Sequence, residues 1–199
     1  MSHPPPHSVY NEIVASKRYS ENIEYGAPRR GHAEGTVRAH IAELEKNLEE
    51  LRLKPGIDYV TYWQLKVLIH VHDTFKAEAK RDSPIMDPQS HASLAKKFLA
   101  EYTSDEDLLN IVQYHDVGYA VYRKYKDTGR LDESRLDEAL SKIKDLDLFL
   151  LFCIIDSCTG SKGREMIEWF VSYVGTKHSV NIGPSWILPA TGAPPNGEF

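Results

Sequence analysis

The sequence is poor in cysteine and has no long hydrophobic run. Its two cysteines, Cys153 and Cys158, lie close together in an apolar segment with helical spacing, which predicts core thiols rather than a disulfide or a zinc site. No apolar stretch approaches the roughly 20 residues that a membrane-spanning helix needs. The first residues, Met-Ser-His-Pro-Pro-Pro-His, lack the basic and apolar regions of a signal peptide. These absences predict a cytoplasmic protein without a membrane segment.

Positive charge is also scarce in this chain. The 24 lysines and arginines are outnumbered by 29 aspartates and glutamates, and the net charge of −5 argues against a general nucleic-acid binder.

Convincing strand patterns and internal repeats are both missing, whereas apolar residues recur with helical spacing. With 199 residues, 41% of them hydrophobic and 27% charged, the chain suits one domain with a sizeable core. We therefore predict an all-α fold.

Segments rich in proline, glycine and polar residues divide the chain into three parts. Residues 1–30 are predicted to form an N-terminal arm with a short helix at 10–17, residues 31–175 a helical domain, and residues 176–199 a Pro/Gly-rich tail. Thr36 is a suitable N-cap for the first helix of the domain. The helices expected within the domain cover residues 36–53, 59–80, 91–102, 104–126, 131–146, 146–157 and 164–173.

Potential metal ligands recur on the apolar stripes of these helices. Three helices carry apolar residues at i, i+3 and i+4 and then a histidine or aspartate at i+7, which the helical period directs to the interior. One buried histidine is readily satisfied by a hydrogen bond, but several on separate helices each need a partner, and a shared metal centre satisfies them together. Imidazole with carboxylate suits Mn, Fe, Co, Ni or Zn better than Ca. The six residues are His40, His72, Asp73, His91, His115 and Asp156.

In this order, His…His-Asp…His…His…Asp, the six residues resemble the ligand set of the HD-domain superfamily of metal-dependent phosphohydrolases. The likeness covers about residues 31–173. The segment His-Asp-Thr-Phe-Lys at 72–76 is similar to the superfamily signature His-Asp-x-Gly-Lys, with Phe75 in place of glycine. The segment Asp-Ser-Cys-Thr-Gly at 156–160 is similar to the one that carries the last ligand.

The resemblance implies an HD-type helical bundle with a binuclear metal centre at its core. One ion would be held by His40, His72, Asp73 and Asp156, and the second by the two middle histidines, with Asp73 bridging. Two divalent ions are expected, Fe or Mn first and Mg, Co, Ni or Zn as alternatives. The implied reaction is hydrolysis of a small, anionic, phosphorylated substrate by a metal-activated hydroxide. Asp73 and Lys76 are the expected catalytic residues.

Several alternatives stay open at this point. The same ligand pattern serves di-iron oxygenases of this superfamily that cleave a C–C or C–P bond, and a metal-bearing module without turnover is a third possibility. Lys76 is equally compatible with a surface lysine, and His32 is an alternative to His40 as the first ligand. Asp116 is expected to have a supporting or surface role, and His70 is not expected to be a ligand. Both expectations follow from the positions of these residues around their helices. Four basic residues are expected to form a solvated face: Arg123, Lys124, Lys162 and Arg164.

Overall fold

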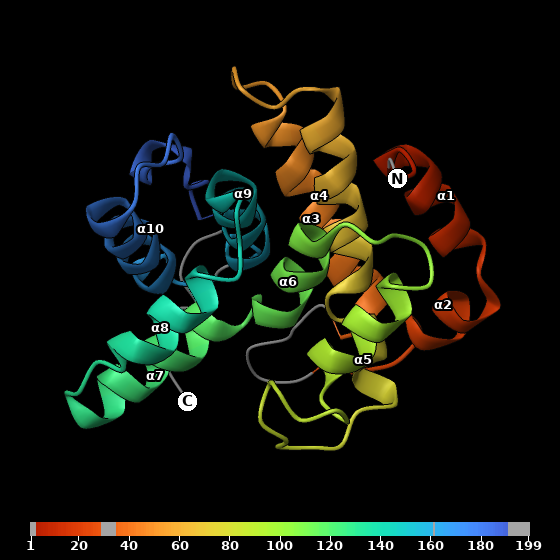
Figure 1. Ribbon diagram of the computed structural model, residues 1–199, viewed down its shortest axis with the longest axis horizontal. Helices are drawn as coiled ribbons and strands as arrows, with labels where there is room; N and C mark the ends of the chain where they lie inside the picture. The colour runs from red at the N-terminus through yellow and green to blue at the C-terminus, as the bar shows by residue number, and fades with distance from the viewer. Residues whose placement is uncertain (1–2, 29–34, 161, 191–199) are drawn as a thin grey trace.

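The computed structural model describes residues 3–28, 35–160 and 162–190, and the fold is all-α as predicted (Figure 1). Within these residues the extended pairing is limited to an isolated bridge between Gly26 and Thr36. The helices are α1 (Pro6–Ala15), α2 (Lys17–Asn22), α3 (Val37–Leu51), α4 (Tyr59–Val71), η1 (Thr74–Ala77), α5 (His91–Leu99), α6 (Glu106–Tyr114), α7 (Val117–Thr128), α8 (Glu133–Leu140), α9 (Leu146–Ser157), α10 (Glu165–Lys177) and η2 (Pro184–Trp186), with η denoting a 3-10 helix.

Two strongly apolar helices form the centre of the molecule. Every residue of α4 from Val67 to Val71 is buried, and so is every residue of α9 from Leu148 to Ile155. A helix that is apolar on all sides must be surrounded by other elements. Accordingly, α4 packs against α1, α3, α6 and α9, while α9 also contacts α3 and α10 (Figure 1). The candidate ligands His72 and Asp156 therefore project from helices that the rest of the fold encloses.

The N-terminal segment packs onto this core. Its predicted helix at 10–17 is replaced by α1, which begins earlier because Pro6 suits the first turn, and by α2, which Ser16 caps. Val9 and Ile13 of α1 are buried in the same hydrophobic cluster as α4. Near the other end of the chain, Leu188 is buried in that cluster too. The three-part division of the chain stays a prediction, and parts of the outer segments share the core.

Two of the predicted helices are interrupted where the sequence analysis expected them to continue. The helix expected at 59–80 ends at Val71, with His72 as its C-cap, and Asp73 then precedes η1. The helix expected at 104–126 divides into α6 and α7 at the pair His115-Asp116. Aspartate has low helix propensity, and in both places it stands at the junction of the two helices. Other expected bounds also shift: α5 ends at Leu99, α8 ends at Leu140 and α10 runs on to Lys177.

The cysteines and the membrane prediction can be checked directly. Cys153 and Cys158 are both free and buried, so the prediction of core thiols is confirmed. Among the helices in the described part of the chain, none combines the length and the apolar character needed to cross a bilayer.

Candidate metal centre

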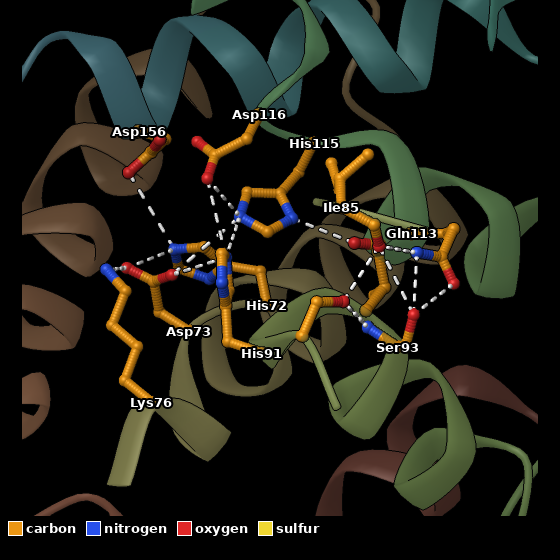
Figure 2. Close-up of polar contacts among 12 residues, drawn as sticks. His72, Asp73, Lys76, Ile85, His91, Ser93, Gln113, His115, Asp116 and Asp156 are labelled. Atoms are coloured by element: carbon orange, nitrogen blue, oxygen red, sulfur yellow. Dashed lines mark hydrogen bonds and ion pairs between the residues drawn. The ribbon is translucent and has the colours of Figure 1, made fainter. Parts of the chain in front are cut away.

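The six predicted ligands converge on one place in the interior, although they come from separate elements. Figure 2 labels five of them: His72, Asp73, His91, His115 and Asp156. Their ligand atoms form two groups, each with all of its atoms within 4.8 Å of one another. The first group joins His40, His72 and Asp156, and the second joins Asp73, His91 and His115. The contributing elements are α3 for His40, the end of α4 for His72, the start of η1 for Asp73, α5 for His91, the end of α6 for His115 and α9 for Asp156.

In the first group, imidazole nitrogens face a carboxylate. His40 Nε2 lies 2.9 Å from Asp156 Oδ1, and His72 Nε2 lies 3.7 Å from the same oxygen. The amide of Asn47, two turns along α3 from His40, donates to the Ile155 carbonyl at 2.8 Å and holds α3 against α9. This contact fixes the distance between the helices that carry His40 and Asp156.

In the second group, two imidazoles approach each other. His91 Nε2 and His115 Nε2 are 3.3 Å apart, and each lies 3.7 Å from Asp73 Oδ1. The helices that carry the two histidines are joined through the Ile85 carbonyl (Figure 2). This oxygen accepts hydrogen bonds of 2.7 Å from both Ser90 Oγ, at the start of α5, and Gln113 Nε2 of α6. The loop before α5 thus positions His91 against His115.

Asp73 connects the two groups. While Oδ1 faces the second group, its other oxygen, Oδ2, lies 3.6 Å from His72 Nε2 and 4.0 Å from His40 Nε2. The carboxylate is 10% exposed and also pairs with the ammonium group of Lys76. Burial opposes its ionisation, but Lys76 and the adjacent histidines hold the pKa of Asp73 well below its usual value. A single ionised carboxylate therefore has one oxygen directed at each group.

His72 carries a buried nitrogen that nothing else satisfies. Its Nδ1 contacts the carbonyls of Leu68 and Ile69 at 3.2 and 3.1 Å, which places the proton on Nδ1 and the lone pair on Nε2. Nε2 is buried and has no hydrogen-bond partner among the residues that the structure describes. Burial lowers the pKa of His72 to about 4, in spite of the charges of Asp73 and Asp156. The lone pair is thus available at neutral pH.

His115 has the opposite electrostatic environment. Its Nδ1 lies 2.8 Å from the Val112 carbonyl, so its Nε2 also points into the centre. Burial by itself lowers its pKa, but the carboxylates of Asp116 and Asp73 outweigh burial and raise the pKa of His115 to about 9. A proton at this position offsets part of the negative charge of the two carboxylates, and a bound cation would do the same.

A cavity of about 430 Å³ opens beside the first group. Its walls include residues 25–28 and 35–37, together with His40, Asp73 and Lys76. Although burial acts against it, the charge of Asp73 raises the pKa of Lys76, so its ammonium group stays charged on the cavity wall. A small anionic molecule in this cavity would have both the candidate ligands and a positive charge beside it.

The structure also separates other sequence candidates from the centre. His70 contacts Tyr19 at 2.5 Å and Glu45 at 2.8 Å on another side of α4, which agrees with its predicted non-ligand role. Arg164 does not belong to a solvated basic face. Its guanidinium donates to main-chain carbonyls, among them those of Cys158 and Leu188, and so ties the C-terminal segment to the end of α9. His32, the alternative first ligand, lies outside the described residues.

Asp116 is closer to the centre than the sequence analysis expected. Its Oδ2 lies 3.4 Å from His91 Nε2 and 3.5 Å from His115 Nε2 (Figure 2). The signal that could have found it is the second His-Asp dipeptide at 115–116, which repeats the pair at 72–73.

Comparison of the chain with known protein families, with curated proteins and with solved structures finds no match, so the assignment of a function rests on this site.

Proposed function

We propose that the protein is a metal-dependent phosphohydrolase of the HD type, which acts on a small phosphorylated molecule. The order of the six residues along the chain supports this proposal, as does their convergence in two adjacent groups. Four imidazoles and two carboxylates form a donor set suited to Mn or Fe, with Co, Ni, Zn and Mg as further possibilities. The proposal assigns two ions to the centre, one to each group.

The single observation that carries the proposal is the buried Nε2 of His72. A buried polar atom without a partner is costly, and such atoms are rare in folded proteins. This one is surrounded by Asp73 Oδ2 at 3.6 Å and Asp156 Oδ1 at 3.7 Å, too far for hydrogen bonds. Ligand atoms bonded to one ion at about 2.0–2.2 Å, at bond angles of about 90–120°, stand about 2.8–3.8 Å apart, so a metal between them accounts for the spacing.

The residues of the chain have distinct parts in the proposed reaction. Two bound divalent ions supply a low-pKa water and polarise a phosphoryl oxygen. The carbonyls behind His72 and His115 fix their rings, so that Nε2 points inward in both. Asp73 keeps the two groups together, and Lys76 presents a positive charge to an anionic substrate in the adjoining cavity. The charge of Lys76 would also stabilise the negative charge that develops on the phosphoryl oxygens.

The metal content of protein purified without oxygen, read together with its electron paramagnetic resonance spectrum, tests the proposal. About two ions per chain, and release of phosphate from a panel of phosphomonoesters and nucleotides with added Mn²⁺ or Co²⁺, are the expected results. A mixed-valent di-iron signal without phosphate release would favour the alternative, an oxygenase that cleaves a C–C or C–P bond. A chain that takes up no metal would contradict both.

A further inference from the structure

The two His-Asp pairs of the chain occupy the same kind of position. His72 is the C-cap of α4, and Asp73 is the N-cap of η1. His115 is likewise the C-cap of α6, while Asp116 is the N-cap of α7. In both pairs the imidazole Nδ1 contacts a carbonyl of the preceding turn, and Nε2 faces the centre. Because the first pair supplies two of the expected ligands, the second pair invites the same question about Asp116.

Asp116 occupies the N-cap position of α7, but its carboxylate does not cap the helix. An aspartate at an N-cap usually accepts a hydrogen bond from a backbone N–H of the first turn. Asp73 and Asp116 accept no such capping bond from any residue in the described ranges. Their carboxylates are both turned towards histidines instead. The N-cap aspartates that do accept a capping bond are Asp58, Asp105, Asp132 and Asp145.

The distances around Asp116 fit a shared ion. Asp116 Oδ2, His91 Nε2 and His115 Nε2 form a triangle with sides of 3.4, 3.5 and 3.3 Å. Atoms bonded to one ion at about 2.1 Å, with bond angles of about 90–110°, stand about 3.0–3.5 Å apart. The triangle is tighter than the contacts of Asp73 Oδ1 with the same two nitrogens, which are both 3.7 Å. Figure 2 shows the Asp116 carboxylate directed at these rings.

We propose that Asp116 is a seventh ligand of the centre and binds the second ion together with His91 and His115. This inference rests on the proposed function, since it assumes that the centre holds two ions. Each ion then has two imidazoles and one carboxylate of its own, Asp156 at the first and Asp116 at the second, and the ions share Asp73. The additional carboxylate makes the second site richer in oxygen, which favours Mn²⁺ or Fe²⁺ over softer ions.

Titration of metal-free protein with Mn²⁺, followed by calorimetry, tests this role. Asp116→Asn keeps the size of the side chain and removes its charge, and Asp127→Asn changes an exposed aspartate of the same helix as a control. We expect the wild type and the control to bind two ions. Asp116→Asn should bind the first ion normally and the second at least about ten-fold more weakly. The visible spectrum of Co²⁺ at the second site should change as well, because a ligand has been lost.

The possible outcomes separate this inference from the proposed function. If the wild type binds two ions and Asp116→Asn binds the second with unchanged affinity, the role of Asp116 is wrong and the proposed centre stands. Weaker binding with an unaltered Co²⁺ spectrum would show that Asp116 acts only by orienting the histidines, which also overturns its role as a ligand. If the wild type binds no ion, the proposed centre and the role of Asp116 fail together.

Discussion

At the scale of single residues, Asp73 is distinguished by the number of imidazoles that it faces. Its two oxygens lie 3.6 to 4.0 Å from the Nε2 atoms of His40, His72, His91 and His115. A carboxylate in this position is surrounded by donor atoms of two sites. No replacement of similar size offers two anionic oxygens. A substitution of Asp73 should therefore disturb both groups at once.

We expect Asp73→Ala to lose both ions and all turnover, whereas Lys76→Ala should retain both ions and turn over more slowly. The reason is that Asp73 contacts both groups, while Lys76 pairs with Asp73 and faces the cavity. Metal content by mass spectrometry and initial rates at saturating metal measure the two effects. Equal metal loss in the two variants would give Lys76 a structural role, and full metal content in Asp73→Ala would exclude a bridging carboxylate.

Glu45 provides a residue-scale prediction about pH that lies outside the centre. A hydrogen bond from His70 and the ion pair with Lys66 lower the pKa of Glu45 to about 2, although partial burial opposes them. Because the folded-state pKa lies below the ordinary value of 4.5, ionised Glu45 stabilises the folded state. This stabilisation is complete above about pH 4.5 and is lost as the pH falls towards 2. Glu45→Gln should therefore be less stable than wild type near pH 6, with a difference that shrinks between pH 5 and 2.

Urea unfolding of both proteins at a series of pH values, with a chelator present throughout, checks this prediction. The chelator keeps the metal ligands in the same state in the two proteins. A stability difference that stays constant from pH 6 to pH 2 would show that Glu45 does not carry the ionisation in question.

At the scale of elements, two of the candidate ligands, His72 and His115, lie where helices end. The 3.6-residue period correctly predicted which residues of α4 and α6 face inward, because it depends only on apolar spacing. It could not predict the breaks after His72 and His115. These depend on imidazole contacts with carbonyls of the last turn and on aspartates that begin the next helix. Periodicity carries no information about such local contacts.

Phe75 shows how one short element depends on a single buried side chain. The ring of Phe75, in η1, is fully buried. Its centroid lies 4.7 Å from the centroid of the Phe98 ring and 4.6 Å from Cζ of Arg18. We expect Phe75→Ala to lower the free energy of unfolding by about 3–5 kcal/mol, because it leaves a cavity. Urea unfolding measures the loss, with Leu53→Ala as the control, since Leu53 is 83% exposed. Equal stability of the two variants would mean that the Phe75 ring contributes little to the stability of the fold.

At the scale of the whole molecule, the sequence located the six converging residues but not the packing around them. Their order and spacing were sufficient because each lies on an apolar stripe or beside a residue that does. The packing of α1 onto α4 was missed, since Val9 and Ile13 are two apolar positions in a polar segment. A supporting or surface role was expected for Asp116 because a continuous helix would turn it away from the centre. The helix breaks after His115, and the Asp116 carboxylate lies 3.5 Å from His115 Nε2.

The centre should also determine the stability of the whole fold. Ligand binding to the native state alone raises stability by about 2.7 kcal/mol for each site filled at 100 times its dissociation constant. We therefore expect Mn²⁺ to raise the Tm of metal-free protein and a chelator to reverse the rise. The double variant His91→Ala/His115→Ala should stay folded, bind about one ion and show a smaller rise, because the first group remains intact.

Thermal unfolding with and without Mn²⁺, combined with metal analysis, measures these effects. His3→Ala/His178→Ala serves as the control, because both histidines lie outside the two groups and the full rise in Tm should survive their loss. If the His91→Ala/His115→Ala variant kept two ions, or kept the full rise, these histidines would be core residues with no part in metal binding. If Mn²⁺ left the Tm of the wild type unchanged, the buried nitrogen of His72 would need a different partner, and a metal centre could no longer account for the convergence of these helices.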